Sequence, residues 1–230
     1  MSLDDALRWT EILLAIAFLQ QSFEHLKAGR SEQKLFAPRI ALSGLLLAGV
    51  GTPWVSLALL GLAMLILRRF QGPYNGGADR MGLLILCCLC GAQFASDPRW
   101  REIIFGYLAL QLTLSYVVSG WVKIVNPDWR SGRALHDVFA YSAYPVSEAM
   151  RAWADRPRIL LVASWSVMLF EVLFPLALIS QTTLIVGLSI AALFHLANAV
   201  LFGLNRFVWA WLAAYPSILW FQDRIFGAGA

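Results

Sequence analysis

The chain has 230 residues, of which 59% are hydrophobic and 14% are charged, and its mean hydropathy is +0.65. A soluble domain carries about 25% charged residues, so this composition excludes an ordinary soluble protein and indicates an integral membrane protein. The net charge is +4. In a membrane protein such an excess reflects the orientation of the loops, and we expect no nucleic-acid partner.

Apolar segments of helical length follow one another along the chain and predict an all-α fold with about eight transmembrane helices. The first segment follows Asp4 and Asp5 instead of the basic region of a signal peptide, so we expect it to be retained. The sequence GVGTPW, with Gly51 and Pro53, is either a tight turn or a kink, and the distribution of Lys and Arg favours the turn. The predicted segments are 6–26, 36–50, 53–70, 81–96, 102–123, 158–179, 183–204 and 207–222.

The same distribution places most basic residues on one side of the membrane. The positive-inside rule would assign that side to the cytoplasm and both termini to the opposite side, but we leave the sidedness open. We expect a multi-pass protein of the bacterial inner (cytoplasmic) membrane, surrounded by membrane lipids. Without repeats or a change in composition, residues 1–230 are predicted to form a single transmembrane domain.

One long connection, residues 124–157, separates the fifth and sixth predicted helices. It mixes aromatic residues such as Phe139, Tyr141 and Trp153 with charged ones, which is typical of an amphipathic helix in the plane of the membrane interface. We predict an interfacial segment here that covers a cavity between the helices.

Three cysteines, Cys87, Cys88 and Cys90, lie together in an apolar segment. The spacing of a zinc site and a fourth ligand are both missing, so we expect no metal. The thiols are predicted to be buried as small hydrophobic groups.

Lys123 ends the fifth predicted helix, on a polar stripe with Tyr116 and Ser119. Two interpretations stay open. The lysine can extend its ammonium group to the lipid headgroups, or, withdrawn from water, it can serve as a general base or nucleophile. Because the stripe is polar within an apolar helix, it should face protein or a water-filled cavity. Tyr116 and Ser119 are therefore candidate ligand-binding residues.

Three more polar side chains, Glu171, His195 and Asn198, lie inside the sixth and seventh predicted helices. Ionisable groups inside a membrane are costly and are functional candidates for that reason. The alternative is structural: an ion pair or hydrogen bond that ties helices together, and a histidine that is a packed, hydrogen-bonded residue. Glu24, His25 and Asp79 lie near helix ends or in a glycine-rich turn, and we assign them no function.

Two stretches carry a resemblance to a known family. GYLALQLTLSYVVSGWVKIVNPDWRSGRAL and FHLANAVLFGLNRFVWAWLAAYPSILWF resemble the membrane domain of vitamin K-dependent gamma-glutamyl carboxylases and the related horizontally transferred transmembrane (HTTM) domains. The similarity runs from about Arg68 to the end of the sequence.

The resemblance implies a function for several of these residues. In the carboxylases, the lysine that matches Lys123 deprotonates reduced vitamin K, and the anion then reacts with oxygen. Carried over, Lys123 is the catalytic base, and His195 acts beside it. Glu171, Asn198 and Trp129 are ligand-binding residues, and the implied cofactor is a quinol or vitamin K-like lipid.

The chain also departs from the carboxylases. They have Asn-Asn-His where this chain has Asn75 followed by two glycines, so Asn75 stays a ligand-binding candidate and the histidine is absent. One extra residue separates Lys123 from the following Asp-Trp pair. We expect neither the large extramembrane domain of the carboxylases nor carboxylation of a protein glutamate.

These observations predict a carboxylase-like membrane protein that binds a lipid-soluble, quinol-type ligand and uses Lys123 as the base of a redox reaction. The alternative is a non-catalytic subunit that assembles or stabilises a larger membrane complex through a membrane protein partner.

Overall fold

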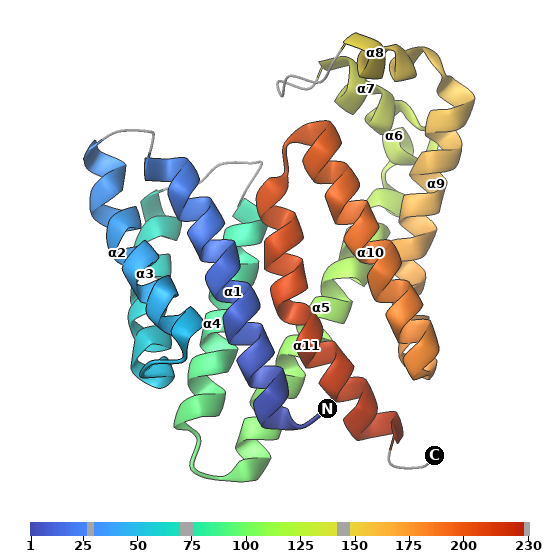
Figure 1. Ribbon diagram of the computed structural model, residues 1–230. Coiled ribbons are helices and arrows are strands. Elements are labelled where there is room, and N and C mark those ends of the chain that lie inside the picture. Colours follow the sequence, from blue (N-terminus) through green and yellow to red (C-terminus); the bar gives the residue numbers. More distant parts are fainter. Residues whose placement is uncertain (27–29, 70–75, 142–147, 228–230) are drawn as a thin grey trace. The chain divides into compact units, whose positions relative to one another are not determined.

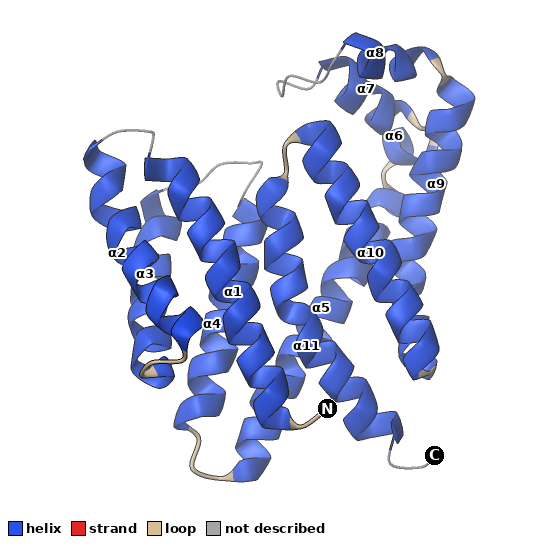
Figure 2. Cartoon of the chain, in the orientation of Figure 1, coloured by secondary structure: helices blue, strands red, loops and turns tan. Residues whose placement is uncertain are grey.

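The computed structural model describes residues 1–26, 30–69, 76–141 and 148–227, and within these ranges it contains helices and no strand (Figures 1 and 2). Each long helix coincides with one predicted apolar segment. The long helices are α1 (Leu3–Leu26), α2 (Arg30–Ala48), α3 (Thr52–Arg69), α4 (Gly76–Phe94), α5 (Pro98–Val125), α9 (Pro157–Leu173), α10 (Gln181–Phe202) and α11 (Asn205–Phe226). The short elements are α6 (Pro127–Arg130), α7 (Arg133–Tyr141), α8 (Glu148–Arg151) and the 3-10 helices η1 (Ala152–Asp155) and η2 (Phe174–Ile179).

Among the described residues, four helical segments are long and apolar enough to cross a membrane: Gly77–Phe94, Pro98–Val125, Pro157–Ile179 and Gln181–Phe202. The predicted class, an all-α integral membrane protein, is confirmed at this level. The number of eight transmembrane helices stays a prediction, because the remaining long helices are shorter in their apolar part or carry more charge.

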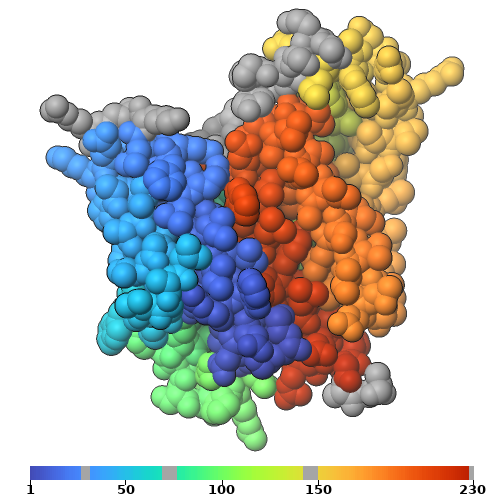
Figure 3. Space-filling view, viewed as in Figure 1, coloured from blue at the N-terminus to red at the C-terminus, as the bar shows by residue number. Residues whose placement is uncertain are grey.

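The chain divides into two compact units. Unit 1 comprises residues 1–110 and 204–230, and unit 2 comprises residues 111–203. In unit 1, α1 packs against α2, α4 and α11, and α3 packs against α2 and α4. α1 and α2 pack side by side on the face shown in Figure 3. The prediction of a single domain stays a prediction.

The sequence GVGTPW forms a tight turn between α2 and α3. Gly49 has a φ of 76° and Gly51 a φ of 57°, values that favour glycine. The amide of Gly49 donates to the carbonyl of Leu46 and that of Val50 to Leu45, the paired bonds of a Schellman motif. The helix therefore ends here, as the distribution of basic residues predicted.

In unit 2, residues of the long connection form short helices. α7 packs against α9 and η1, and α6 packs against α7 and α9. Phe139 is buried, whereas Tyr141 and Trp153 are exposed, so α7 has an apolar face toward the protein. The position of this segment at a membrane interface stays a prediction.

The prediction for the cysteines is wrong in one respect. Cys88 and Cys90 are buried, but Cys87 is exposed on α4. It lies on an apolar helix that is long enough to cross a membrane. No group of metal-binding side chains is found among the described residues.

Arg8 of α1 links this helix to the end of α2 and, through Glu11, to α4. Its Nη1 atom lies 2.7 Å from a carboxylate oxygen of Glu11 and donates to the carbonyl of Leu46, while Nη2 donates to that of Leu47. Glu11 is only 5% exposed and also accepts a hydrogen bond from Gln93 of α4. Arg8 thus satisfies carbonyls at the end of α2 and neutralises a buried carboxylate.

We expect Arg8→Ala to lower the free energy of unfolding by about 2 kcal/mol, because Glu11 loses its cation and two carbonyls lose their donor. Arg101→Ala is the control, since its partner Asp4 is exposed and such pairs contribute less than about 1 kcal/mol. Thermal unfolding in mild detergent measures both. Equal effects of the two substitutions would contradict this account of Arg8.

Candidate functional site

The candidate site in unit 2 is built around Lys123, in the last turn of α5. Its Nζ atom lies 2.6 Å and 2.8 Å from the two carboxylate oxygens of Glu171 on α9, and 2.7 Å from the hydroxyl of Ser119. The side chain of Glu171 is 3% exposed and that of Lys123 is 16% exposed. The sequence left open whether Lys123 extends to the lipid headgroups and whether Glu171 forms an ion pair. In the structure Glu171 is paired, and the ammonium group of Lys123 is turned inward toward it.

Gly120 allows this pair to form, because it brings α5 close to α9. A Cβ atom at Gly120 would lie 2.7 Å from a side-chain carbon of Val172 and 2.8 Å from its backbone nitrogen. Real Cβ atoms do not approach other atoms so closely. Only glycine fits, and it lies one turn before Lys123, so the close approach occurs where the ammonium group must reach Glu171.

The residues after Lys123 form a short helix, α6, beside the pair. The side chain of Asn126 accepts a hydrogen bond from the amide of Asp128 and caps α6, which begins with Pro127. The ring of Trp129 lies with its centre 5.4 Å from Nζ of Lys123. This distance allows a cation–π interaction, so Trp129 forms one wall around the ammonium group.

α6 is held against α9 by its backbone. Ser164 donates to the carbonyl of Trp129 at 2.6 Å, and the indole of Trp165 donates to that of Arg130 at 3.1 Å. Gly132 has a φ of 77°, and a Cβ atom there would lie 3.0 Å from the Cα atom of Leu161. The Asn-Pro-Asp-Trp-Arg-x-Gly sequence therefore builds a tight, fixed turn that places Trp129.

A second polar contact lies on the same stripe of α5. The hydroxyl of Tyr116 is 3.0 Å from Nε2 of His195 on α10, and both side chains are buried. The ring of Tyr116 also packs against Phe170 and Phe174. Because Tyr116 precedes Ser119 by three residues, one helix presents both polar groups on one face.

The structure does not bring all predicted residues together. Asn198 lies on α10 one turn after His195 and is partly exposed, and no hydrogen bond of its side chain is found within the described ranges. Asn75 lies outside the described residues. The predicted ligand-binding and catalytic roles of the site residues stay predictions, while the contacts of Lys123 with Glu171 and of Tyr116 with His195 are observed.

Pro175 shapes the helix that carries Glu171. Proline has no N–H and cannot continue the α-helical pattern, and α9 ends at Leu173 and continues as η2. A groove of about 340 Å³ lies along this region. Its lining is apolar and comes from α9, η2 and α10, including Phe170 and Phe174. The two rings that pack on Tyr116 thus also line the groove.

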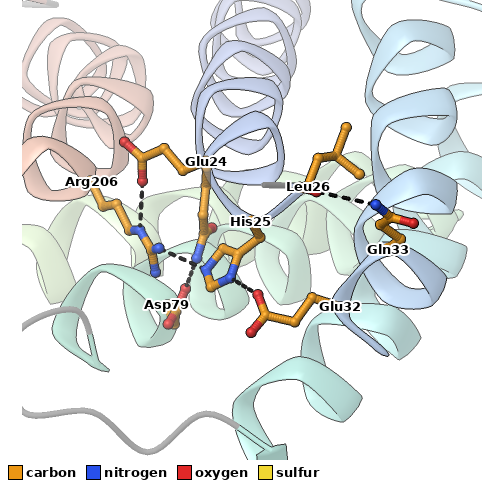
Figure 4. A network of polar contacts seen from close by, with 8 residues as sticks. Glu24, His25, Leu26, Glu32, Gln33, Asp79 and Arg206 are labelled. Atoms are coloured by element: carbon orange, nitrogen blue, oxygen red, sulfur yellow. Dashed lines mark hydrogen bonds and ion pairs between the residues drawn. The ribbon is translucent and has the colours of Figure 1, made fainter. Parts of the chain in front are cut away.

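Sequence reasoning missed a polar cluster in unit 1 (Figure 4). His25 contacts Glu32 through Nδ1 at 2.5 Å and Arg206 through Nε2 at 2.7 Å. Arg206 also pairs with Glu24 at 3.3 Å. Each residue alone looked like an ordinary helix end. The distribution of basic residues did indicate that these helix ends lie on the same side of the membrane.

The fold and the site together define a class: an integral membrane protein of helices with an ammonium–carboxylate pair buried among them. The family model described as the HTTM domain matches residues 92–223. The chain therefore belongs to the HTTM domain family. Comparison with curated proteins and with solved structures finds no match. The matched range includes Lys123, Glu171 and His195.

We expect Gly120→Ala to lower the free energy of unfolding by about 1 to 3 kcal/mol, because the added methyl group forces α5 and α9 apart. The separation should also weaken the contact between Lys123 and Glu171. Gly61→Ala is the matched control, since a Cβ atom at this helical glycine meets nothing within 4 Å and alanine favours the helix. Thermal unfolding in detergent measures both; a Gly120→Ala protein as stable as the control would refute the close approach.

Proposed function

We propose that unit 2 binds a lipid-soluble ligand of the quinol type and that Lys123 is the base that removes a proton from its hydroxyl group. One observation carries the proposal: Nζ of Lys123 lies 2.6 Å from Glu171 within helices long enough to cross a membrane. The carboxylate of Glu171 is only 3% exposed, and burying such a group costs desolvation energy that pairing does not fully return. An ionisable pair in this position is therefore a functional candidate.

Glu171 supplies the means for Lys123 to act as a base. A base must be neutral before it accepts a proton, and the ammonium group touches both oxygens of Glu171. Transfer of one proton to Glu171 leaves a neutral amine and a neutral acid. Lys123 then takes the proton of a ligand hydroxyl and becomes an ammonium ion again, so every proton is accounted for.

The surroundings of the pair fit an amphipathic ligand with a flat polar head and an apolar tail. Trp129 and Tyr116 offer aromatic surfaces, and Ser119 and the Tyr116–His195 pair offer hydrogen-bonding groups. The apolar groove bounded by Phe170 and Phe174 suits a hydrocarbon tail. When bound, a quinol-type lipid supplies electrons that leave more readily once Lys123 holds its proton, and the resemblance implies dioxygen as their acceptor.

We place eight helices across a bacterial inner membrane, with α6 to η1 at the interface. The amphipathic α7 supports this, because Phe139 faces the protein while Tyr141 and Arg133 are exposed. The distribution of basic residues assigns this segment to the cytoplasmic side, whereas the resemblance implies the opposite side, because the carboxylase site faces the lumen. The proposed proton transfer to Lys123 is the same on either side.

The test uses the full chain in mild detergent and menadiol, a soluble quinol with no tail, as the probe. We expect the double variant Lys123→Met, Glu171→Gln to bind the probe at least about tenfold more weakly, measured by quenching of tryptophan fluorescence. Removing both charges avoids leaving a carboxylate buried and unpaired, so the variant should fold. The exposed Lys34 provides the control, Lys34→Met, which should bind like the wild type.

A second measurement is the quinone content of lipids extracted from the purified proteins, which should fall in the double variant and not in the control. Equal binding and equal quinone content in all three proteins would refute the proposal. If the wild type binds no quinol and instead copurifies with a membrane protein in fixed stoichiometry, the alternative of a non-catalytic assembly subunit is the correct one.

A further inference from the structure

The polar cluster of unit 1 lies where three helices begin. α2, α4 and α11 start at this end of unit 1, and α1 ends there. Glu32 and Asp79 lie in the first turns of α2 and α4, as expected for acidic residues at helix starts.

The carboxylates of the cluster have partners within it (Figure 4). Glu32 contacts His25, Glu24 pairs with Arg206, and Asp79 accepts a hydrogen bond from Gln21 at 2.6 Å. Glu24 also accepts a hydrogen bond from Gln20. These contacts account for the acidic side chains of the cluster.

Arg39 of α2 is the exception. It is only 3% exposed, and its guanidinium carbon lies 3.8 Å from the centre of the Phe18 ring and 5.9 Å from that of Phe36. Its Nη1 atom is buried and has no hydrogen-bond partner among the residues that the structure describes. Leaving a buried charged donor unsatisfied is costly, and the aromatic rings offset only part of that cost.

Arg39 lies beside the cluster, because the Phe36 ring near its guanidinium group stacks on the ring of His25 with 4.0 Å between the ring centres. Among the described residues, neither Asp79 nor Arg206 forms an ion pair with Arg39. Asp79 uses one oxygen for Gln21, and Arg206 has the same sign of charge. Within the described part of the chain, Nη1 of Arg39 therefore still lacks an acceptor.

We propose that the cluster around Arg39 is a binding site for a small oxyanion, a phosphate or carboxylate group held against Nη1 of Arg39. The planar guanidinium group matches the paired oxygens of such anions. The anion is either free in solution or the end group of a membrane lipid. This site is separate from the quinol proposal and does not depend on it.

The test is thermal unfolding of the full chain in mild detergent at constant ionic strength, with inorganic phosphate in one series and short-chain phosphatidylglycerol in another. We expect at least one of them to raise the unfolding midpoint in a saturable way. A response to both indicates a free anion site, and a response to the lipid alone indicates a headgroup site. Arg39→Met should lose at least about tenfold in apparent affinity, whereas the exposed Arg133 should tolerate Arg133→Met without loss.

Asp79→Asn separates this proposal from a structural pairing of Arg39 with Asp79. Asparagine keeps an acceptor for Gln21 and removes one negative charge, so the anion should bind more tightly than in the wild type. If Arg39 only pairs with Asp79, the same variant loses stability and shows no anion response. That result overturns the proposal, as does an Arg39→Met protein that responds like the wild type. Because Asp79→Asn leaves Arg39 in place, the test stands even if Arg39→Met fails to fold.

Discussion

The ion pair between Lys123 and Glu171 is the constraint on which unit 2 depends. Inside a membrane, a carboxylate or an ammonium group alone is costly, and each makes the other tolerable. The two side chains meet only if α5 and α9 approach closely, which requires Gly120. Three features of the local sequence meet this requirement. Gly120 allows the close approach, Lys123 follows one turn later, and the next turn places Trp129 beside the ammonium group.

Much of this could be predicted from the sequence, because its signals are local. The length of the apolar segments located the long helices. The helical rotation of about 100° per residue placed Tyr116, Ser119 and Lys123 on one face. The pairing of Lys123 with Glu171 could not be derived, since 48 residues separate them. The decisive signal, the missing side chain of Gly120, is informative only once it is known which helix lies opposite.

The cluster of unit 1 escaped prediction for a related reason. Glu24, His25, Asp79 and Arg206 lie near helix ends, where charged residues are common and need no explanation. These residues form a cluster only because the fold brings the end of α1 and the starts of α2, α4 and α11 together. Arg39 differs from these residues, because it lies nine residues inside α2. From the sequence alone it was counted as one more basic residue near a loop.

The two units bury cations of different kinds, and the chemistry of the two groups separates what each can do. An amine can give up its proton when a carboxylate at 2.6 Å can take it, so the pair in unit 2 suits proton transfer. A guanidinium group keeps its proton in proteins and therefore cannot act as a base at Arg39. It can hold an anion with its remaining donors, and Nη1 of Arg39 has no hydrogen-bond partner in the described part of the chain.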